Sequence, residues 1–270
     1  MTAQVANFSL YRVGAMVLRH WYLLRSSWPR LLELVYWPAV QMFMWGFLQL
    51  GVGKLPGALA GTVSTFLAAF LLWDILFRGQ IGYSISFLEE MWSRNLGHLF
   101  VSPLRPYELV ISLVLMSLIR TLIGVGGAAL IAILLFNYNI FDMGLPLLSF
   151  FLNLIVMGWA IGLLVAGIVL RYGLGAESVA WVAVFAIQPI SAIYYPVSVL
   201  PEWLQPVAWC LPSSYVFEGM RELLFEQTFN TTLLWQSMAL NLLYLIGGIS
   251  AFLAFFRAAR QRGLLLQVGE

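Results

Sequence analysis

The sequence predicts an all-α integral membrane protein, a single transmembrane domain of residues 1–270 with six spanning helices. Three observations support this fold class. Hydrophobic residues make up 61% of the 270 residues and charged residues only 10%, whereas a soluble domain carries about 25% charged residues. The mean hydropathy is +0.89. The apolar residues also form long runs, and a helix needs about 20 of them to cross a bilayer.

Six apolar runs have the length of a transmembrane helix. Helices are expected because lipid offers the backbone no hydrogen bonds and the sequence shows no alternating barrel pattern. The second run is the weakest because Asp74 and Arg78 interrupt it, and the third is longer than a bilayer requires. The predicted spans are 31–50, 62–86, 107–136, 145–170, 178–199 and 233–256.

Residues 8–30, before the first span, are expected to form an amphipathic interfacial helix. Arg12, Arg19 and Ser26 recur every seven residues and so lie close to one helix face, while Trp21 and other apolar residues cover the rest. Such a helix lies in the membrane interface with its basic side toward the lipid headgroups. A contact of the same face with a cytoplasmic partner is the alternative.

The basic residues predict the orientation in the membrane. With the N-terminus inside, Lys54 and Arg221 alone lie on the outer side, and ten arginines lie on the inner side. Because basic residues are retained on the cytoplasmic side, both termini are predicted to be cytoplasmic. The ten inner arginines are Arg12, Arg19, Arg25, Arg30, Arg94, Arg105, Arg171, Arg257, Arg260 and Arg262.

Residues 200–232 form a long mixed segment on the predicted outer side. Prolines divide it into pieces that are too short to span, and its aromatic residues suit a membrane interface. Two short helices that dip back toward the membrane and a simple cap over the outer helix ends are equally good interpretations. The residues that we assign to this segment are Pro201, Trp203, Trp209, Glu218 and Arg221.

Three charged residues fall deep inside predicted spans, away from the span ends, where charge is expensive and usually paired or functional. Asp74 and Arg78 are four residues apart in the second span, so they share a helix face, and Arg120 lies in the third. Asp74 and Arg120 lie at similar depths, about 18–20 Å from the inner helix ends. We therefore predict an Asp74–Arg120 contact with Arg78 shared, and favour a structural role over a proton or substrate relay.

Small residues in the fourth span form a stripe at Gly158 and Gly162. Glycines four residues apart lie on one face of a helix and let the backbones of two helices approach closely. This stripe predicts a close helix contact.

The polar stretch FLEEMWSRNLGHLFVSPLRP, residues 87–106, interrupts the apolar pattern between the second and third spans. A plain turn between antiparallel helices needs about 2–8 residues, so this longer segment predicts a docking element, with an ordinary loop as the alternative. Glu89, Glu90 and Arg94 suit a short surface helix that Gly97 ends or bends. The prolines that follow redirect the chain into the third span.

Two stretches resemble the permeases of ABC exporters of the second type. FLEEMWSRNLGHLFVSPLRPYELV is similar to their coupling-helix region, in which a glutamate, a basic residue, a small residue and leucines precede a proline-containing turn. YPVSVLPEWLQPVAWCLPSSYVFEGMR is similar to their segment after the fifth span, which ends in Glu-Gly-x-Arg. The resemblance covers essentially the whole chain. Residues 94–97 read Arg-Asn-Leu-Gly, where many relatives have Arg-Gly-Thr-Leu.

The resemblance implies the membrane subunit of a bacterial ABC exporter, a homodimer in the inner (plasma) membrane that works with two copies of a separate ABC ATPase. The chain has no nucleotide motif, so it would bind no cofactor and catalyse no reaction itself, and the ATPase would hold ATP and Mg. Drugs, lipids and lipid-linked polysaccharides are the implied substrates. Nucleic acid is not an expected partner, since the net charge is only +2.

The resemblance also implies roles for individual segments. Spans one, two and five would line the substrate path at the dimer interface, residues 200–232 would form the exit gate, and residues 8–30 would frame the ATPase contact. The residues expected at that contact are Glu89, Glu90, Met91, Trp92, Arg94, Leu96 and His98.

Two other classes of protein fit the sequence less well. An ion-gradient-driven secondary transporter would usually show broken spans in related halves and ionisable groups at the midplane, and Asp74 is the only deep acid in the predicted spans. A membrane-embedded lipid-modifying enzyme would carry clustered acids or histidines at the interface. Beyond Glu89 and Glu90 the sequence has no such cluster.

Overall fold

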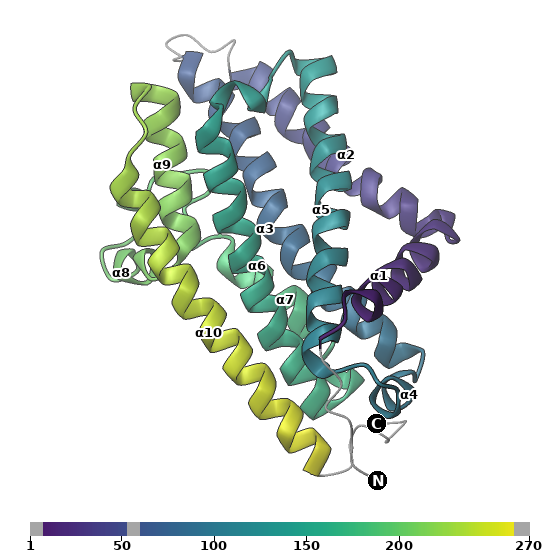
Figure 1. Cartoon of the computed structure of the whole chain (residues 1–270). Helices are drawn as coiled ribbons and strands as arrows, with labels where there is room; N and C mark the ends of the chain where they lie inside the picture. The colour runs from purple at the N-terminus through teal and green to yellow at the C-terminus, as the bar shows by residue number, and fades with distance from the viewer. Residues whose placement is uncertain (1–7, 53–59, 262–270) are drawn as a thin grey trace.

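The computed structural model of the protein describes residues 8–52 and 60–261, and these residues form helices and connections without a β-strand (Figure 1). Five of the described helices are long and apolar enough to cross a membrane. They are α2 (Trp28–Val52), α3 (Ala60–Trp92), α5 (Pro106–Phe136), α6 (Leu145–Tyr172) and α10 (Thr231–Gln261). Lys54 and Arg262, which entered the orientation argument, lie outside the described residues.

Local sequence signals set the ends of these helices. α5 begins at Pro106, whose missing N–H costs nothing in the first turn. The carboxylate of Glu108 then accepts a hydrogen bond from the Arg105 backbone N–H at 3.0 Å. At the other end, Asn137 ends α5 in the left-handed conformation, with φ of 51°.

The predicted fifth span is not a continuous helix. α7 (Val179–Ile187) has nine residues, about 13 Å at 1.5 Å per residue, against about 30 Å of hydrocarbon. It follows the short helix η2 (Leu174–Ala176), and the chain after it turns back and reaches η3 (Val197–Val199). Pro189 lacks the N–H that would continue the helix. The prediction of a helix over 178–199 was therefore wrong.

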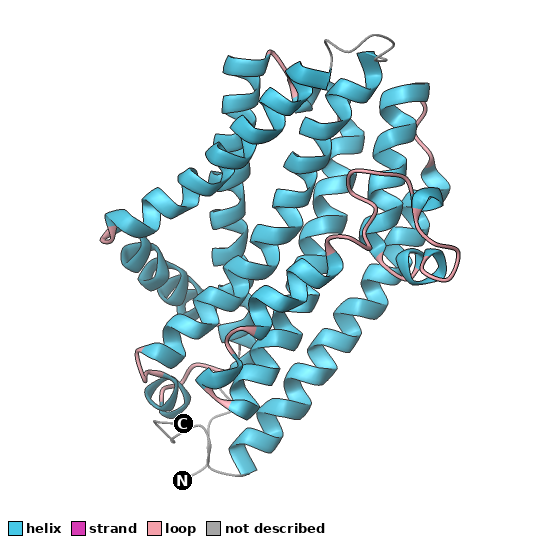
Figure 2. Ribbon diagram, turned by 180° about the vertical axis from the view of Figure 1, so that it is seen from behind, coloured by secondary structure: helices cyan, strands magenta, loops and turns pink. Residues whose placement is uncertain are grey.

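α3 is the central helix of the bundle. It packs against α5 on one side and α6 on another, and α6 in turn packs against α10 (Figures 1 and 2). The glycine stripe explains how close α3 and α6 are, because a Cβ at Gly158 would lie 2.8 Å from the Leu76 carbonyl oxygen. α6 and α10 also approach closely, because a Cβ at Gly248 of α10 would lie 2.5 Å from the carbonyl oxygen of Ala160 in α6. The predicted close helix contact at Gly158 is confirmed.

The first two helices diverge from the bundle on one side (Figure 1). α1 (Leu10–Arg25) ends before the turn at Ser26, and α2 begins at Trp28. The stretch 8–30 is therefore not one helix, because its last residues belong to α2. The start of α1, the end of α10 and the short helix α4 (Leu96–Val101) all lie at one end of the molecule. We call this the α4 end.

The segment 87–106 also divides differently from the prediction. Glu89 and Glu90 belong to the last turn of α3, and the short helix α4 begins only at Leu96. Between them α3 ends in a Schellman motif, in which the Asn95 N–H donates to the Glu90 carbonyl at 3.0 Å. Arg94 takes the left-handed position there, with φ of 57°.

Residues 200–232 contain two short helices, α8 (Gln205–Trp209) and α9 (Pro212–Glu226). α9 packs against α10 and α6. In both views α8 lies level with the upper part of α10 rather than beyond its end (Figures 1 and 2). The helix η1 (Ile140–Met143) joins α5 to α6 at the end opposite to α4.

Candidate functional site

The helices α2, α3, α5 and α7 surround a pocket of about 590 Å³. Its volume is in the range of small-molecule sites, about 300–1,000 Å³. Apolar and aromatic side chains dominate its lining, with charged groups distributed among them. The aromatic side chains in the lining are Trp37, Phe70, Trp73, Phe77, Trp92, Trp181, Phe185 and Tyr194.

One wall of the pocket is an aromatic cluster built by α3 and α7. The ring centroid of Phe77 lies 6.2 Å from that of Trp181 and 6.0 Å from that of Phe185. Trp181 and Phe185 are one helical turn apart and stack on each other at 6.4 Å. Trp181 is 41% exposed and Phe185 52% exposed, so both leave ring surface free for a ligand.

Two separate charge pairs occupy the pocket wall, and they differ from the predicted arrangement. Arg78 Nε donates to Asp74 Oδ2 at 2.6 Å, across one turn of α3. Arg120 instead reaches Glu89, with its terminal nitrogen 3.2 Å from both carboxylate oxygens. The predicted Asp74–Arg120 contact was therefore wrong. The two residues do not lie at the equal depth that the sequence suggested, because Ser117 and Gly124 of α5, on either side of Arg120, face Gly82 and Arg78 of α3.

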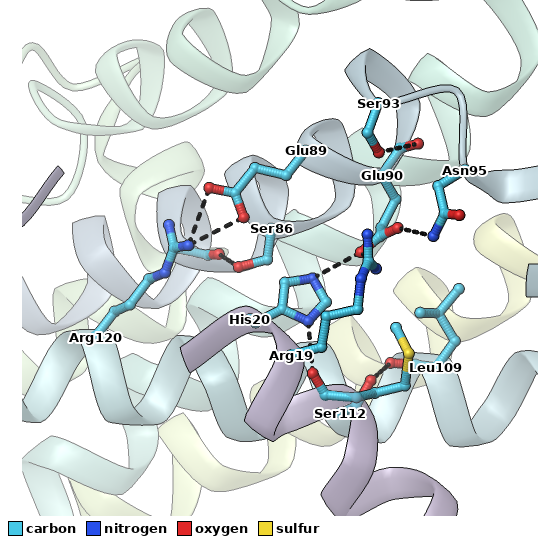
Figure 3. A network of polar contacts seen from close by, with 12 residues as sticks. Arg19, His20, Ser86, Glu89, Glu90, Ser93, Asn95, Leu109, Ser112 and Arg120 are labelled. Atoms are coloured by element: carbon cyan, nitrogen blue, oxygen red, sulfur yellow. Dashed lines mark hydrogen bonds and ion pairs between the residues drawn. The ribbon is translucent and has the colours of Figure 1, made fainter. Parts of the chain in front are cut away.

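Glu89 joins three helices at the side of the pocket nearest to α4. Its carboxylate accepts from Arg120 of α5 (Figure 3). It also lies 3.1 Å from a terminal nitrogen of Arg30 at the start of α2. The side chain of Glu89 is only 5% exposed. One carboxylate thus lies between two guanidinium groups, which leaves the group with one net positive charge, and it ties α2 and α5 to α3.

Glu90 faces away from the pocket and joins α1 to the α4 end. Its buried carboxylate pairs with Arg19 and lies 3.2 Å from His20 Nε2 (Figure 3). It also accepts a hydrogen bond from Asn95 Nδ2 at 2.8 Å, immediately before α4. His20 is held in turn by a contact of 2.9 Å between its Nδ1 and the Met16 carbonyl.

The basic side of α1 faces protein carboxylates, not the lipid headgroups that the sequence predicted. Arg12 donates to Glu108 at 2.6 and 2.8 Å, and Arg19 pairs with Glu90. The hydrogen bond to Glu108 raises the pKa of Arg12, because it stabilises the charged guanidinium. Trp21 packs beside Leu24 in a small apolar cluster against α2 and α5. α1 is therefore held to the bundle by two ion pairs and this cluster.

The residues predicted for an ATPase contact divide into two groups. Glu89, Glu90 and Leu96 are buried within the chain, and Met91 is partly buried. Their side chains are therefore used inside the protein, which revises the interpretation of the two carboxylates as surface contacts. Trp92, Arg94 and His98 are exposed at the α4 end. Trp92 also donates to Glu177 at 3.1 Å, which connects α3 to the segment before α7.

The residues predicted for the outer segment hold the connection between α7 and α9. Glu218 Oε1 accepts from the Val197 N–H at 2.6 Å. Arg221 donates to the Ile193 carbonyl at 3.3 Å and pairs with Glu218 at 3.1 Å. Trp209 packs on Tyr215, with 4.8 Å between the ring centroids. Pro201 and Trp203 are exposed.

Sequence reasoning missed several residues of the pocket. Glu33 and Trp37 are four apart on α2, and Trp181 and Phe185 are four apart on α7. This spacing places each pair on one helix face. It was a usable signal, but it did not reveal that the two faces line the same pocket.

The fold and the pocket define a multi-pass helical membrane protein with an aromatic, charge-containing pocket between its helices. The sequence model of the ABC-2 type transporter family matches residues 11–225, and the chain belongs to this family. It is therefore a permease component of an ABC transporter, and the family implies an ABC ATPase as its partner. A search of curated proteins found no match.

Proposed function

We propose that the protein exports a hydrophobic or amphipathic substrate across the inner membrane, as a homodimer with two copies of a separate ATPase that holds ATP and Mg. The observation that carries this proposal is the aromatic pocket, whose wall connects through adjacent residues to the exposed α4 end. Drugs, lipids and lipid-linked polysaccharides all have apolar parts that suit such a pocket. Both termini would be cytoplasmic, on the side of α4.

The α4 end has the features of a docking surface for the ATPase. Val101 is 85% exposed and Trp92 46% exposed, and Arg94 and His98 are exposed between them in sequence. A mixed surface of aromatic, basic and apolar side chains is typical of protein interfaces. These four residues form the proposed ATPase contact.

Movement of the ATPase would reach the pocket through the end of α3. Asn95 links the start of α4 to Glu90, and the neighbouring Glu89 holds Arg30 of α2 and Arg120 of α5. Short rigid helices that are tied to long ones can convert a displacement at an interface into helix tilt. A displacement of α4 would therefore change the position of the pocket wall.

The proposed homodimer has a free apolar face on α2. Tyr36, Phe43 and Phe47 are 51%, 41% and 63% exposed. Because α2 also carries part of the pocket lining, a second copy packed beside it would close the substrate path. Residues 200–232, which lie near the upper half of α10, would form the exit gate.

Affinity purification of the tagged chain from its native membrane tests the proposal. We expect an ABC ATPase to co-purify with the wild type and to be lost with Val101→Asp, which places a charge in the proposed contact. Val199→Asp is the matched control, because Val199 is also exposed (67%) but lies in η3. Absence of any ATPase with the wild type would contradict the proposed function. Equal recovery of the ATPase with the two variants would contradict the proposed contact at the α4 end.

One observation favours a second candidate, an ion-gradient-driven transporter. Asp74 and Arg78 are buried and line the pocket, and an acid at membrane depth can carry a proton. Uptake of substrate by the chain alone in proteoliposomes, driven by a pH gradient without ATP, would support this candidate.

A further inference from the structure

Glu33 differs from the other charged side chains of the pocket. It lies on α2, lines the pocket and is exposed, and no described residue forms an ion pair with it. Asp74 is matched by Arg78, and Glu89 is matched by Arg30 and Arg120. Glu33 is therefore the one lining carboxylate whose charge the described part of the chain leaves without an ion-pair partner.

Besides this carboxylate, the pocket contains aromatic rings that can bind a cation. Trp37 follows Glu33 by one turn on α2, and Trp181 and Phe185 of α7 add exposed ring surface to the same pocket lining. The faces of aromatic rings attract cations, tryptophan most strongly, and the attraction grows when water is excluded. A positively charged group near Glu33 would thus contact a carboxylate and aromatic rings together.

An anion would meet a less favourable arrangement. Arg30 and Arg120 both bind Glu89, and Arg78 binds Asp74. An anion at one of these guanidinium groups would compete with the carboxylate that already binds it, whereas a cation at Glu33 would displace no ion-pair partner. The lining carries three acids and three arginines, and the Arg30–Glu89–Arg120 group keeps one net positive charge that balances Glu33. Glu33 differs in that its charged group is not engaged by any ion pair among the described residues.

We propose that the pocket selects cationic amphipathic substrates, with Glu33 pairing with the positive group while Trp37 and Trp181 hold the apolar part. This inference rests on the proposed function, since it takes the pocket as the substrate site. It narrows the substrate to molecules that carry a permanent or protonated positive charge on an apolar, preferably aromatic, body.

Two probes of equal shape and opposite charge test the selection. Equilibrium dialysis of the full-length protein in a nonionic detergent measures binding of tetraphenylphosphonium and of tetraphenylborate, each corrected for protein-free micelles. We expect the wild type to bind tetraphenylphosphonium more tightly, and Glu33→Gln to weaken its binding about tenfold, the loss of one close charge contact. Glu226→Gln is the control, because it removes an exposed carboxylate that is not among the lining residues.

Three results would overturn the inference: preference for tetraphenylborate, no binding of either probe above the micelle level, or equal weakening by Glu33→Gln and Glu226→Gln. Purification of the ATPase with the Glu33→Gln variant keeps this test separate from the proposed function. If the ATPase is recovered while the charge preference is absent, the cation inference alone fails. If no ATPase is recovered with wild type or variant, the proposed function fails whatever the probes show.

Discussion

Glu89 and Glu90 are neighbours in the chain, yet their carboxylates face different sides of α3. Glu89 accepts from Arg120 on the pocket wall, whereas Glu90 accepts from Asn95 beside α4 and pairs with Arg19 of α1. Successive residues on a helix are about 100° apart, so adjacent side chains reach different surroundings. This pair therefore joins the α4 end to the pocket within one turn of helix.

Replacing Glu90 with Gln should lower the stability of the protein. The buried carboxylate loses its charge opposite Arg19, whose side chain is 35% exposed. The cost should be about 2 kcal/mol, below the ~3–5 kcal/mol of a fully buried pair. Thermal unfolding of the detergent-purified protein measures it, with Glu226→Gln as a surface control. Equal unfolding midpoints for the two variants would show that the Glu90 contacts contribute little.

The Glu89–Arg120 pair should show strong coupling in a double-mutant cycle. Arg120→Gln leaves Glu89 with Arg30 alone, and Glu89→Gln leaves a mostly buried guanidinium. The double variant removes both charges, so it should be more stable than the sum of the single losses by about 1–3 kcal/mol. Unfolding of the four proteins in a denaturing detergent tests this, and additive losses would argue against a direct pair.

Replacing Asp74 with Asn should impair folding or expression. It leaves Arg78, whose side chain is 10% exposed, without its ion pair in the bundle, and breaking a buried pair costs about 3–5 kcal/mol. The amount of protein integrated in the membrane is the readout. Normal expression together with complete loss of transport would indicate a relay role for Asp74 rather than a structural one.

Replacing Gly158 with Ala should destabilise the contact between α3 and α6. The new methyl group would lie 2.8 Å from the Leu76 carbonyl oxygen and 2.9 Å from the Gln80 backbone nitrogen. Overpacking of this kind costs about 1–3 kcal/mol.

Gly126→Ala is the matched control for this glycine. It adds the same methyl group to α5, where nothing lies within 4 Å, and it should leave stability unchanged or raise it by up to about 1 kcal/mol, because alanine is the better helix former. Unfolding curves of the two alanine variants make the comparison. Similar curves would mean that α3 and α6 are less tightly packed than the structure indicates.

The sequence by itself determined the membrane class and five of the long helices, and it offered two short helices after residue 200 as one of two interpretations. Each of these depends on runs of neighbouring residues. In lipid each spanning segment must pair its own backbone groups as a helix, so hydropathy and proline positions along the sequence are enough to locate the segment. The same reasoning failed at 178–199, where an apolar run contains a short helix and a turn.

Tertiary structure decided which charges meet. Arg120 was predicted beside Asp74 and lies beside Glu89, and the basic side of α1 was predicted to face lipid and faces Glu90 and Glu108. Helix tilt and the reach of long side chains set these contacts, and neither is encoded in spacing along the chain. The pocket, which needs faces of α2, α3 and α7 from distant parts of the sequence, was likewise decided only when the helices packed.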